Sequence, residues 1–165
     1  MSAALSPDLK VLVVGAGAMG SGIAQVAAAA GHTVYLYDSR AEAADQGRAG
    51  IVAALDKLAA KGRMSAEAAQ AAAARVLPVS ELGAARDAGL VVEAIVEDLA
   101  VKRALFAELE GLLGVDAILA SNTSSLSITA LAAPLARPGR VAGLHFFNPA
   151  PVLQLVGVVS GLATD

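Results

Sequence analysis

Three glycines at fixed spacing, placed directly after an apolar run, constrain the fold of this chain more than any other feature. The run Lys10–Gly15 reads KVLVVG, and its β-branched residues predict a strand buried on both faces. It continues into the hexad GAGAMG at positions 15–20 and a small-residue helix from about Met19 to Ala30, which Gly31 ends. The next run, Thr33–Asp38, reads TVYLYD and predicts a second strand. Strand, helix and strand at this spacing predict a βαβ unit with parallel strands and a right-handed crossover.

The rest of the chain continues to alternate between helical and strand-like segments. Helical character runs from Ala41 to about Arg75 with a break at Lys61–Ser65, where Ser65 is expected to cap the second helix. Further strands are expected near residues 77–79, 90–95, 117–121, 140–149 and 153–161, with helical segments at 81–88, 99–113 and 128–133. This alternation predicts an α/β fold, a doubly wound and mainly parallel Rossmann sheet that forms a single domain over residues 1–165.

The helix expected at 99–113 carries apolar residues at helical spacing. These are Val101, Leu105, Leu109 and Leu112. Such a stripe is typical of the face that a helix turns toward the core.

Composition excludes several classes of partner and chemistry. The net charge is −3 and the basic residues are scattered, so we expect neither nucleic acid nor an anionic membrane surface as a partner. The chain has no cysteine, which excludes disulfides and thiolate catalysis, and its two histidines and dispersed acids show no metal-ligand spacing. The N-terminus lacks a signal-peptide pattern, and no apolar run approaches the roughly 18–20 residues of a membrane helix. A cytoplasmic protein is therefore expected.

The position of the hexad between a strand and a helix indicates a dinucleotide site. The first glycine of such a hexad makes the tight turn, the second lets the backbone approach the pyrophosphate, and the third lets the helix pack close to the sheet. Asp38, about 20 residues on, can bind both ribose hydroxyls and would repel a 2′-phosphate, which favours NAD over NADP. Arg40 lies near Asp38 and could instead bind the 2′-phosphate of NADP. The alternative to a dinucleotide site as a whole is an ordinary glycine-rich turn in an α/β protein. The expected cofactor-binding residues here are Gly15, Gly17, Ala18, Met19, Gly20 and Asp38.

Two later segments carry side chains suited to catalysis. His145, in GLHFFNP, follows an apolar strand at the carboxyl edge of the expected sheet, where an imidazole can act as a general base. A structural histidine beside two phenylalanines is the alternative. His32 lies between a helix and a strand and is expected to be an exposed turn residue. Residues 121–125, SNTSS, place five hydrogen-bonding side chains after another apolar strand, more than helix capping needs, so we expect a ligand-binding role.

Four longer strings resemble the NAD-dependent 3-hydroxyacyl-CoA dehydrogenase family, and the resemblance covers most of Lys10–Asp165. They are GAGAMGSGIA, VVEAIVEDLAVKRALF, ASNTSSLSIT and RVAGLHFFNPAPV. The ending LVGVVSGLATD resembles the 3-hydroxyadipyl-CoA and 3-hydroxybutyryl-CoA branches, of which the former belongs to bacterial phenylacetate degradation. The resemblance implies hydride transfer between the 3-hydroxyl carbon of a 3-hydroxyacyl-CoA and NAD, in fatty acid metabolism and β-oxidation.

The resemblance also implies roles for individual residues. His145 matches the family's catalytic base, and Ser124 matches the serine that hydrogen-bonds the substrate oxygen. Asn148 matches an asparagine beside the nicotinamide, and Lys61 lies where the family presents a basic residue to coenzyme A. Further positions on the cofactor side are matched by Glu97, Lys102 and Asn122.

Two departures from the family pattern bear on activity. The family pairs its base with a glutamate twelve residues later, in the run LVEV, whereas this chain has Gly157 there, in LVGV. The family also has a helical C-terminal domain of roughly 100 residues that forms a homodimer and closes the substrate cleft, and we expect this chain to lack it. The oligomeric state of the chain itself stays open. Three hypotheses for the function stay open: an impaired 3-hydroxyacyl-CoA dehydrogenase, a non-catalytic NAD-binding module, and another hydroxyacid dehydrogenase.

Overall fold

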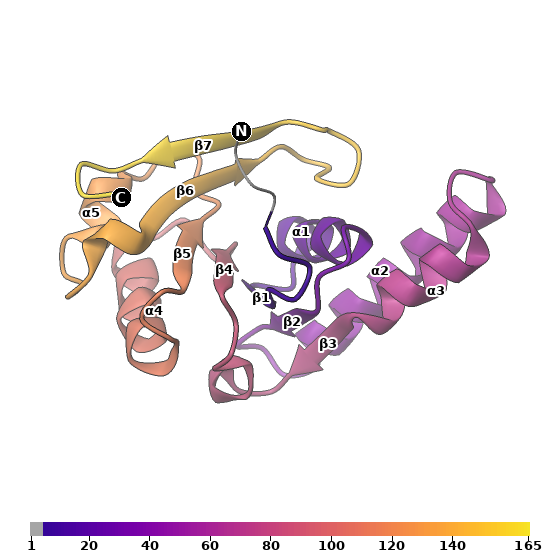
Figure 1. Ribbon diagram of the computed structural model, residues 1–165, viewed down its shortest axis with the longest axis horizontal. Helices are drawn as coiled ribbons and strands as arrows, with labels where there is room; N and C mark the ends of the chain where they lie inside the picture. The colour runs from indigo at the N-terminus through magenta and orange to yellow at the C-terminus, as the bar shows by residue number, and fades with distance from the viewer. Residues whose placement is uncertain (1–4) are drawn as a thin grey trace.

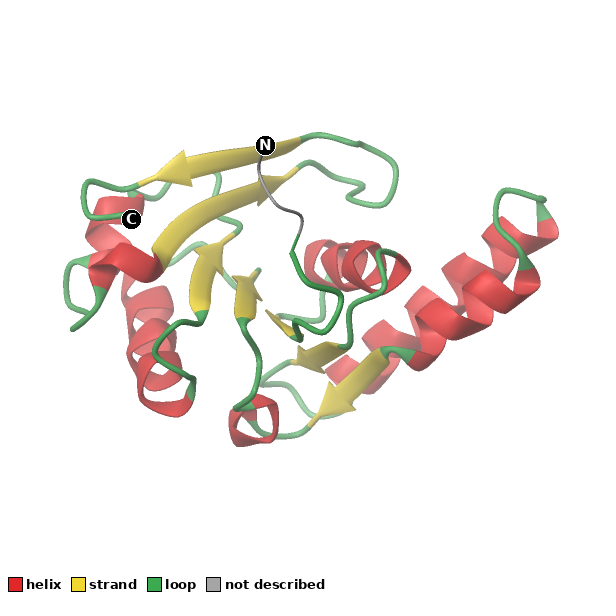
Figure 2. Cartoon of the chain, in the orientation of Figure 1, coloured by secondary structure: helices red, strands yellow, loops and turns green. Residues whose placement is uncertain are grey.

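The computed structural model, described for residues 5–165, contains one seven-stranded sheet with helices on both faces (Figure 1 and Figure 2). The spatial order is β3-β2-β1-β4-β5-β6-β7. All neighbouring pairs are parallel except β6 and β7, which are antiparallel. The strands are β1 Val11–Val14, β2 Val34–Tyr37, β3 Val76–Val79, β4 Leu90–Glu93, β5 Ile118–Ser121, β6 Val141–Phe146 and β7 Val156–Ser160. The predicted doubly wound, mainly parallel sheet is confirmed.

The helices divide between the two faces of the sheet (Figure 1). The helices and 3-10 turns are α1 Ala18–Ala29, α2 Ala43–Ala60, α3 Ala66–Ala74, η1 Leu82–Ala85, α4 Leu99–Leu112, α5 Ile128–Ala132 and η2 Pro138–Arg140. Strand β1 serves both faces, because Val11 and Val13 pack in the α1–α3 core while Leu12 and Val14 pack in the core under α4 and α5. All four of its residues are buried, as predicted for a parallel strand covered on both sides. In the described part of the chain no helix has the length and apolar character needed to cross a bilayer.

Local signals at the helix ends are confirmed in two places and wrong in one. Gly31 follows α1 with a φ of 106°, the left-handed conformation that ends a helix at low cost for glycine. Ser65 caps α3, and its hydroxyl oxygen accepts a hydrogen bond of 3.1 Å from the amide of Ala68. His32 is half-buried, not exposed, because its Nδ1 lies 2.9 Å from the carbonyl oxygen of Leu9.

The buried face of α4 differs from the predicted apolar stripe. Of the predicted residues Leu109 is buried, but Val101 is 45% and Leu112 38% exposed. The core face instead carries Lys102 and Phe106, both 1% exposed or less. The prediction missed Lys102 because a pattern of apolar residues counts lysine as polar, whereas here Lys102 is buried against the buried carboxylate of Glu93 and lies 3.3 Å from the exposed carboxylate of Glu97.

Alanine substitutions on α4 separate the two faces. We expect Phe106→Ala to lower the free energy of unfolding by about 3–5 kcal/mol, because it leaves a cavity at a fully buried position. Leu112→Ala should cost less than about 1 kcal/mol, since this side chain already contacts solvent. Urea unfolding followed by circular dichroism measures both. Equal losses for the two variants would show that the observed helix face is wrong.

Candidate active site

The carboxyl ends of the central strands meet in one row. In register across the sheet lie Tyr37, Val14, Glu93, Ser121 and Gly143. The glycine loop follows β1, Glu97 follows β4, the SNTSS segment ends β5, and His145 lies near the end of β6. The order of the strands reverses between β1 and β4, and ligands of open α/β sheets bind outside the carboxyl ends at such a point.

The three glycines of the loop are needed for three different physical reasons. Gly15 has a φ of +103°, and a Cβ there would lie 2.5 Å from the carbonyl oxygen of Ala94. A Cβ on Gly20 would lie 1.7 Å from the carbonyl oxygen of Gly15, so only glycine lets α1 pack this close to β1. Around Gly17 a Cβ would meet nothing within 4 Å, which leaves the backbone open toward a ligand. Gly17 is also the N-cap of α1 and no side chain caps the helix, so its first amides face outward.

Of the two other loop residues predicted to bind the cofactor, one faces outward and one packs inward. Ala18 is the first residue of α1 and is exposed. Met19 is half-buried and packs against the core under α1–α3, so its backbone, more than its side chain, is available to a ligand.

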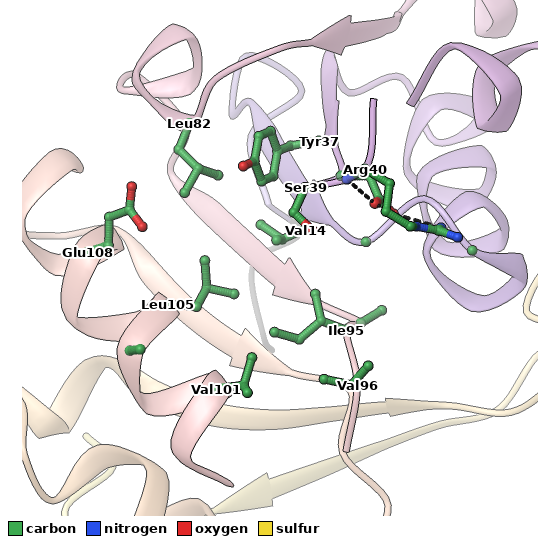
Figure 3. A pocket seen from close by; sticks show the side chains of 15 residues that line it. Val14, Tyr37, Ser39, Arg40, Leu82, Ile95, Val96, Val101, Leu105 and Glu108 are labelled. Atoms are coloured by element: carbon green, nitrogen blue, oxygen red, sulfur yellow. Dashed lines mark hydrogen bonds and ion pairs between the residues drawn. The ribbon is translucent and has the colours of Figure 1, made fainter. Parts of the chain in front are cut away.

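A cavity of about 660 Å³ lies beside the glycine loop, within the size range of small-molecule and cofactor sites (Figure 3). Its walls are mainly apolar, with Val14, Ile95, Val96, Val101 and Leu105 on one side and polar groups near the ends of β1 and β2. Val101, predicted as a core residue, therefore lines this cavity, whereas Leu105 lines it and also packs against the core under α4 and α5. The full set of lining residues is Val14, Gly15, Gly17, Tyr37, Asp38, Ser39, Arg40, Leu82, Ala94, Ile95, Val96, Val101, Ala104, Leu105 and Glu108.

Asp38 is the acidic residue at the end of β2 that the sequence predicted. One oxygen of its carboxylate accepts a hydrogen bond of 2.9 Å from the amide of Ala16, which ties β2 to the glycine loop. The Arg40 guanidinium donates to the same carboxylate and lowers the pKa of Asp38 from 3.8 to about 2, against burial, which raises it. An ionised acceptor beside a glycine loop and an apolar cavity fits the adenosine ribose of a dinucleotide.

A buried ion pair, which the sequence did not predict, lies directly beneath this edge. Glu93 is fully buried, and its Oε1 lies 2.6 Å from the Nζ of Lys102 and accepts a 2.7 Å hydrogen bond from the amide of Ile95. Its Oε2 accepts from the hydroxyl of Ser121 at 2.6 Å. A carboxylate within the apolar run VVEAIV was the available signal. Lys102 also lies 3.3 Å from Glu97, and since the lysine side chain is 1% and the Glu97 side chain 40% exposed, Glu97 is the member of this pair that contacts solvent.

The SNTSS segment uses most of its hydrogen-bonding side chains within the protein. Ser121 donates to Glu93, while Thr123 and Ser125 both donate to Glu97. Burial raises the pKa of Glu97, but the hydrogen bond from Thr123 and the charge of Lys102 outweigh it and hold that pKa below its usual value. Ser124 is exposed between these anchored residues, so it is the member of the segment best placed to meet a ligand.

His145 and Asn122 join the ends of β5 and β6. The side-chain Oδ1 of Asn122 accepts a 2.8 Å hydrogen bond from the backbone amide of Phe146, and the backbone carbonyl oxygen of Asn122 lies 3.3 Å from the Nδ1 of His145. A carbonyl only accepts, so Nδ1 is the donor in this contact, and in the neutral ring this tautomer has its lone pair on Nε2. The imidazole packs edge-on against Phe147, with ring centroids 4.7 Å apart.

Gly157 is the cross-strand partner of His145 in the antiparallel pair of β6 and β7. A Cβ at position 157 would lie 3.7 Å from the Cβ of His145, and nothing closer stands in its way. Side chains at directly opposed positions of an antiparallel pair share a face of the sheet and interact. The structure therefore has room for a Cβ at position 157 on the face that carries the His145 side chain, and glycine supplies none.

The predicted site residues outside the first two strands and the glycine loop do not line the cavity: Glu97, Lys102, Asn122, Ser124, His145, Asn148 and Lys61. Asn148 is exposed in the turn after β6. Lys61 caps the C-terminus of α2 at the exposed tip of the α2–α3 hairpin, which projects away from the sheet (Figure 1). Neither residue lines the cavity beside the glycine loop. Among residues 5–165, no three His, Asp or Glu side chains gather in a way that could hold a metal ion.

Together, the strand order, the glycine loop, the acceptor at Asp38 and the cavity between them define a Rossmann-type dinucleotide-binding domain. Comparison with known proteins narrows this class. Residues 10–165 match the family model described as 3-hydroxyacyl-CoA dehydrogenase, NAD binding domain. The chain belongs to this family of NAD-dependent oxidoreductases, and NAD is the cofactor of the matched domain.

Individual relatives agree with this assignment. The chain is 52% identical to 3-hydroxyadipyl-CoA dehydrogenase of Escherichia coli over 93% of its own length, and 46% identical to 3-hydroxybutyryl-CoA dehydrogenase of Bradyrhizobium diazoefficiens over 94%. The crystal structure of 3-hydroxybutyryl-CoA dehydrogenase from Escherichia coli superposes with a TM-score of 0.93 at 51% identity, over 96% of this chain and 34% of that one. The chain spans 32% and 53% of the lengths of the two curated relatives.

Two glycine variants separate folding from cofactor binding. Gly20→Ala should lower the free energy of unfolding by about 3 kcal/mol or more, because its methyl group would overlap backbone atoms of Gly15. Gly17→Ala should change stability by less than about 1 kcal/mol, yet weaken NADH binding about tenfold or more by intruding where the phosphates approach. Urea unfolding and NADH fluorescence titration give the two quantities. Unchanged NADH affinity in Gly17→Ala would argue against the phosphates lying on this loop.

Proposed function

We propose that this chain forms the cofactor half of an oxidoreductase that transfers hydride between the 3-hydroxyl carbon of a 3-hydroxyacyl-CoA and NAD. The observation that carries the proposal is the imidazole of His145, whose Nδ1 is engaged by the carbonyl of Asn122 and whose Nε2 keeps its lone pair. It lies along the same edge of the sheet as the glycine loop and the SNTSS segment.

Each residue then has a defined task in the reaction. NAD, when bound, accepts the hydride from carbon 3. His145 takes the proton of the 3-hydroxyl group on Nε2, and Ser124, held between two anchored hydroxyls, hydrogen-bonds the substrate oxygen. Asn148 is assigned to the nicotinamide side, and Lys61 to the coenzyme A end of the substrate. Glu97 and Asn122 shape the cofactor side, and Lys102 acts there through Glu97.

The substrate class follows from the family, and the branch is proposed from the relatives. Two of them are named for 3-hydroxyadipyl-CoA and 3-hydroxybutyryl-CoA, so we propose a short or dicarboxylic 3-hydroxyacyl-CoA, with a role in β-oxidation or phenylacetate degradation. A cytoplasmic location stays a prediction from the sequence.

The apolar surface of the last strands supports a substrate site completed by a further part of the protein. Val152, Leu155, Val158 and Leu162 are 60–92% exposed, around and along edge strand β7. A row of exposed apolar side chains of this kind marks a contact surface. We propose that the family's helical C-terminal domain covers it and closes the cleft, and that the same domain forms the homodimer.

One observation favours a second function, that of an NAD-binding module without catalysis. A histidine base gains orientation and cation stabilisation from a carboxylate on its other side, and Gly157 offers none at the position facing His145. The dinucleotide half of the site does not involve this position.

Restoring the carboxylate distinguishes the two functions. We expect Gly157→Glu to raise turnover about 10- to 100-fold in a polypeptide that continues through the family's C-terminal domain, because the new side chain lies beside the imidazole. The turnover of the 165-residue chain should rise little, since this polypeptide does not include the C-terminal domain that we propose closes the cleft. NADH absorbance with (S)-3-hydroxybutyryl-CoA measures all four polypeptides. Equal turnover of the glycine and glutamate forms at full length would show that the missing carboxylate is not what limits activity.

The preference for NADH over NADPH tests the dinucleotide site at the glycine loop and Asp38, independently of His145. The chain should bind NADH more tightly than NADPH, because the ionised carboxylate of Asp38 repels a 2′-phosphate. Asp38→Asn should lower the ratio of the NADPH and NADH dissociation constants by about tenfold, equivalent to ~1.4 kcal/mol. Fluorescence titration of both dinucleotides provides the affinities. Equal affinities in the unchanged chain would contradict the role assigned to Asp38.

A further inference from the structure

The carboxylate of Asp38 has a donor at each of its acceptor positions. The amides of Ala16 and Arg40 donate to it at 2.9 Å each. The Arg40 side chain adds two more hydrogen bonds, from Nε at 3.1 Å to Oδ1 and from Nη2 at 3.2 Å to Oδ2 (Figure 3). A carboxylate offers about four lone-pair positions, so one guanidinium takes half of the acceptor capacity of Asp38.

The two kinds of donor differ in how easily they can leave. The amides belong to the ordered glycine loop and to the chain after β2, whereas the Arg40 side chain is 71% exposed. Exposed ion pairs are weak, and losing one changes an equilibrium by a factor of about two to five. Two ribose hydroxyls that donate to Asp38 must therefore displace the guanidinium, and that displacement weakens dinucleotide binding by a factor of this size.

The charges around Arg40 give it a second role. Arg40 lines the main cavity and two neighbouring hollows of about 500 and 270 Å³. Among the described residues lining these three spaces Arg40 is the single cation. The acids that line them are Asp38 after β2, Glu42 and Asp45 at the start of α2, and Glu108 on α4. A phosphate on the ribose 2′-oxygen would meet an acidic surface with Arg40 as its sole counter-charge.

We propose that Arg40 is the residue that sets how strongly this site discriminates between NAD and NADP. It competes with the ribose hydroxyls of NAD for Asp38, and it pairs with the 2′-phosphate of NADP. Both effects narrow the preference for NAD that Asp38 creates. This inference rests on the proposed dinucleotide site.

Arg40→Gln tests the inference, because it removes the charge and keeps most of the side-chain length. We expect NADH to bind about two- to fivefold more tightly and NADPH severalfold more weakly, so that the ratio of the NADPH and NADH dissociation constants rises about fivefold or more. The loss for NADPH should shrink as salt is raised, since the paired charges are exposed. The matched control is Arg63→Gln, an exposed arginine in the turn between α2 and α3 that should leave the ratio unchanged.

A double-variant cycle with Asp38→Asn separates the two effects of Arg40. If the guanidinium acts on NADH through Asp38, Arg40→Gln gives no gain in NADH affinity once Asp38 is replaced, yet it still weakens NADPH. Fluorescence titration of the 165-residue chain provides every dissociation constant.

The outcomes fall into distinct groups. A ratio that stays the same in Arg40→Gln, or that changes equally in Arg63→Gln, overturns the inference and leaves the proposed function standing. An equal loss of affinity for NADH and NADPH in Arg40→Gln also overturns the inference, because Arg40 would then bind a part of the dinucleotide that both cofactors share. An unchanged chain that binds neither dinucleotide overturns the proposed function itself.

Discussion

The buried ion pair between Glu93 and Lys102 connects the two halves of the site. Two charges without solvent contact cost several kcal/mol each to bury, and removing one partner of such a pair typically costs about 3–5 kcal/mol. The pair is tolerated because Glu93 also accepts from the hydroxyl of Ser121 and the amide of Ile95. Its strand neighbours are Val14, which leads into the glycine loop, and Ser121, which leads into the SNTSS segment. One carboxylate thus fixes the geometry on both sides of the point where the strand order reverses.

Local signals in the sequence were sufficient for the sheet and for the glycine loop. The β-branched runs, the glycine spacing and the acid after the second strand all act within about 30 residues, and the structure confirms each of them. The buried face of α4 could not be predicted in this way. Its lysine is buried by partners on another element, and the hydroxyls of the SNTSS segment find theirs 26–28 residues away. Contacts between side chains of different elements depend on the assembled sheet, whatever their separation in sequence, and leave no periodic trace.

The direction of the last strand determines how Gly157 affects His145. A seventh strand parallel to β6 would need a long crossover, and a residue twelve positions after the histidine could not lie opposite it. Because β7 is antiparallel, the chain returns along β6 and places position 157 on the same face as the imidazole. A spacing of twelve residues between the histidine and the acid in the family pattern therefore corresponds to the register that places the two positions opposite each other. In this chain the register is kept and only the side chain is missing.

The surroundings of the glycine loop and the surroundings of His145 are built from different parts of the chain. The glycine loop, Asp38 and the cavity use residues from β1, β2, η1, the segment after β4 and α4, and none from β6 or β7. The imidazole of His145 instead contacts the backbone carbonyl of Asn122, and its strand partner is Gly157 of the antiparallel pair. A change confined to β7 therefore alters the surroundings of His145 without altering a residue that lines the cavity. For this reason the fold and the surroundings of the glycine loop do not depend on which side chain stands at position 157.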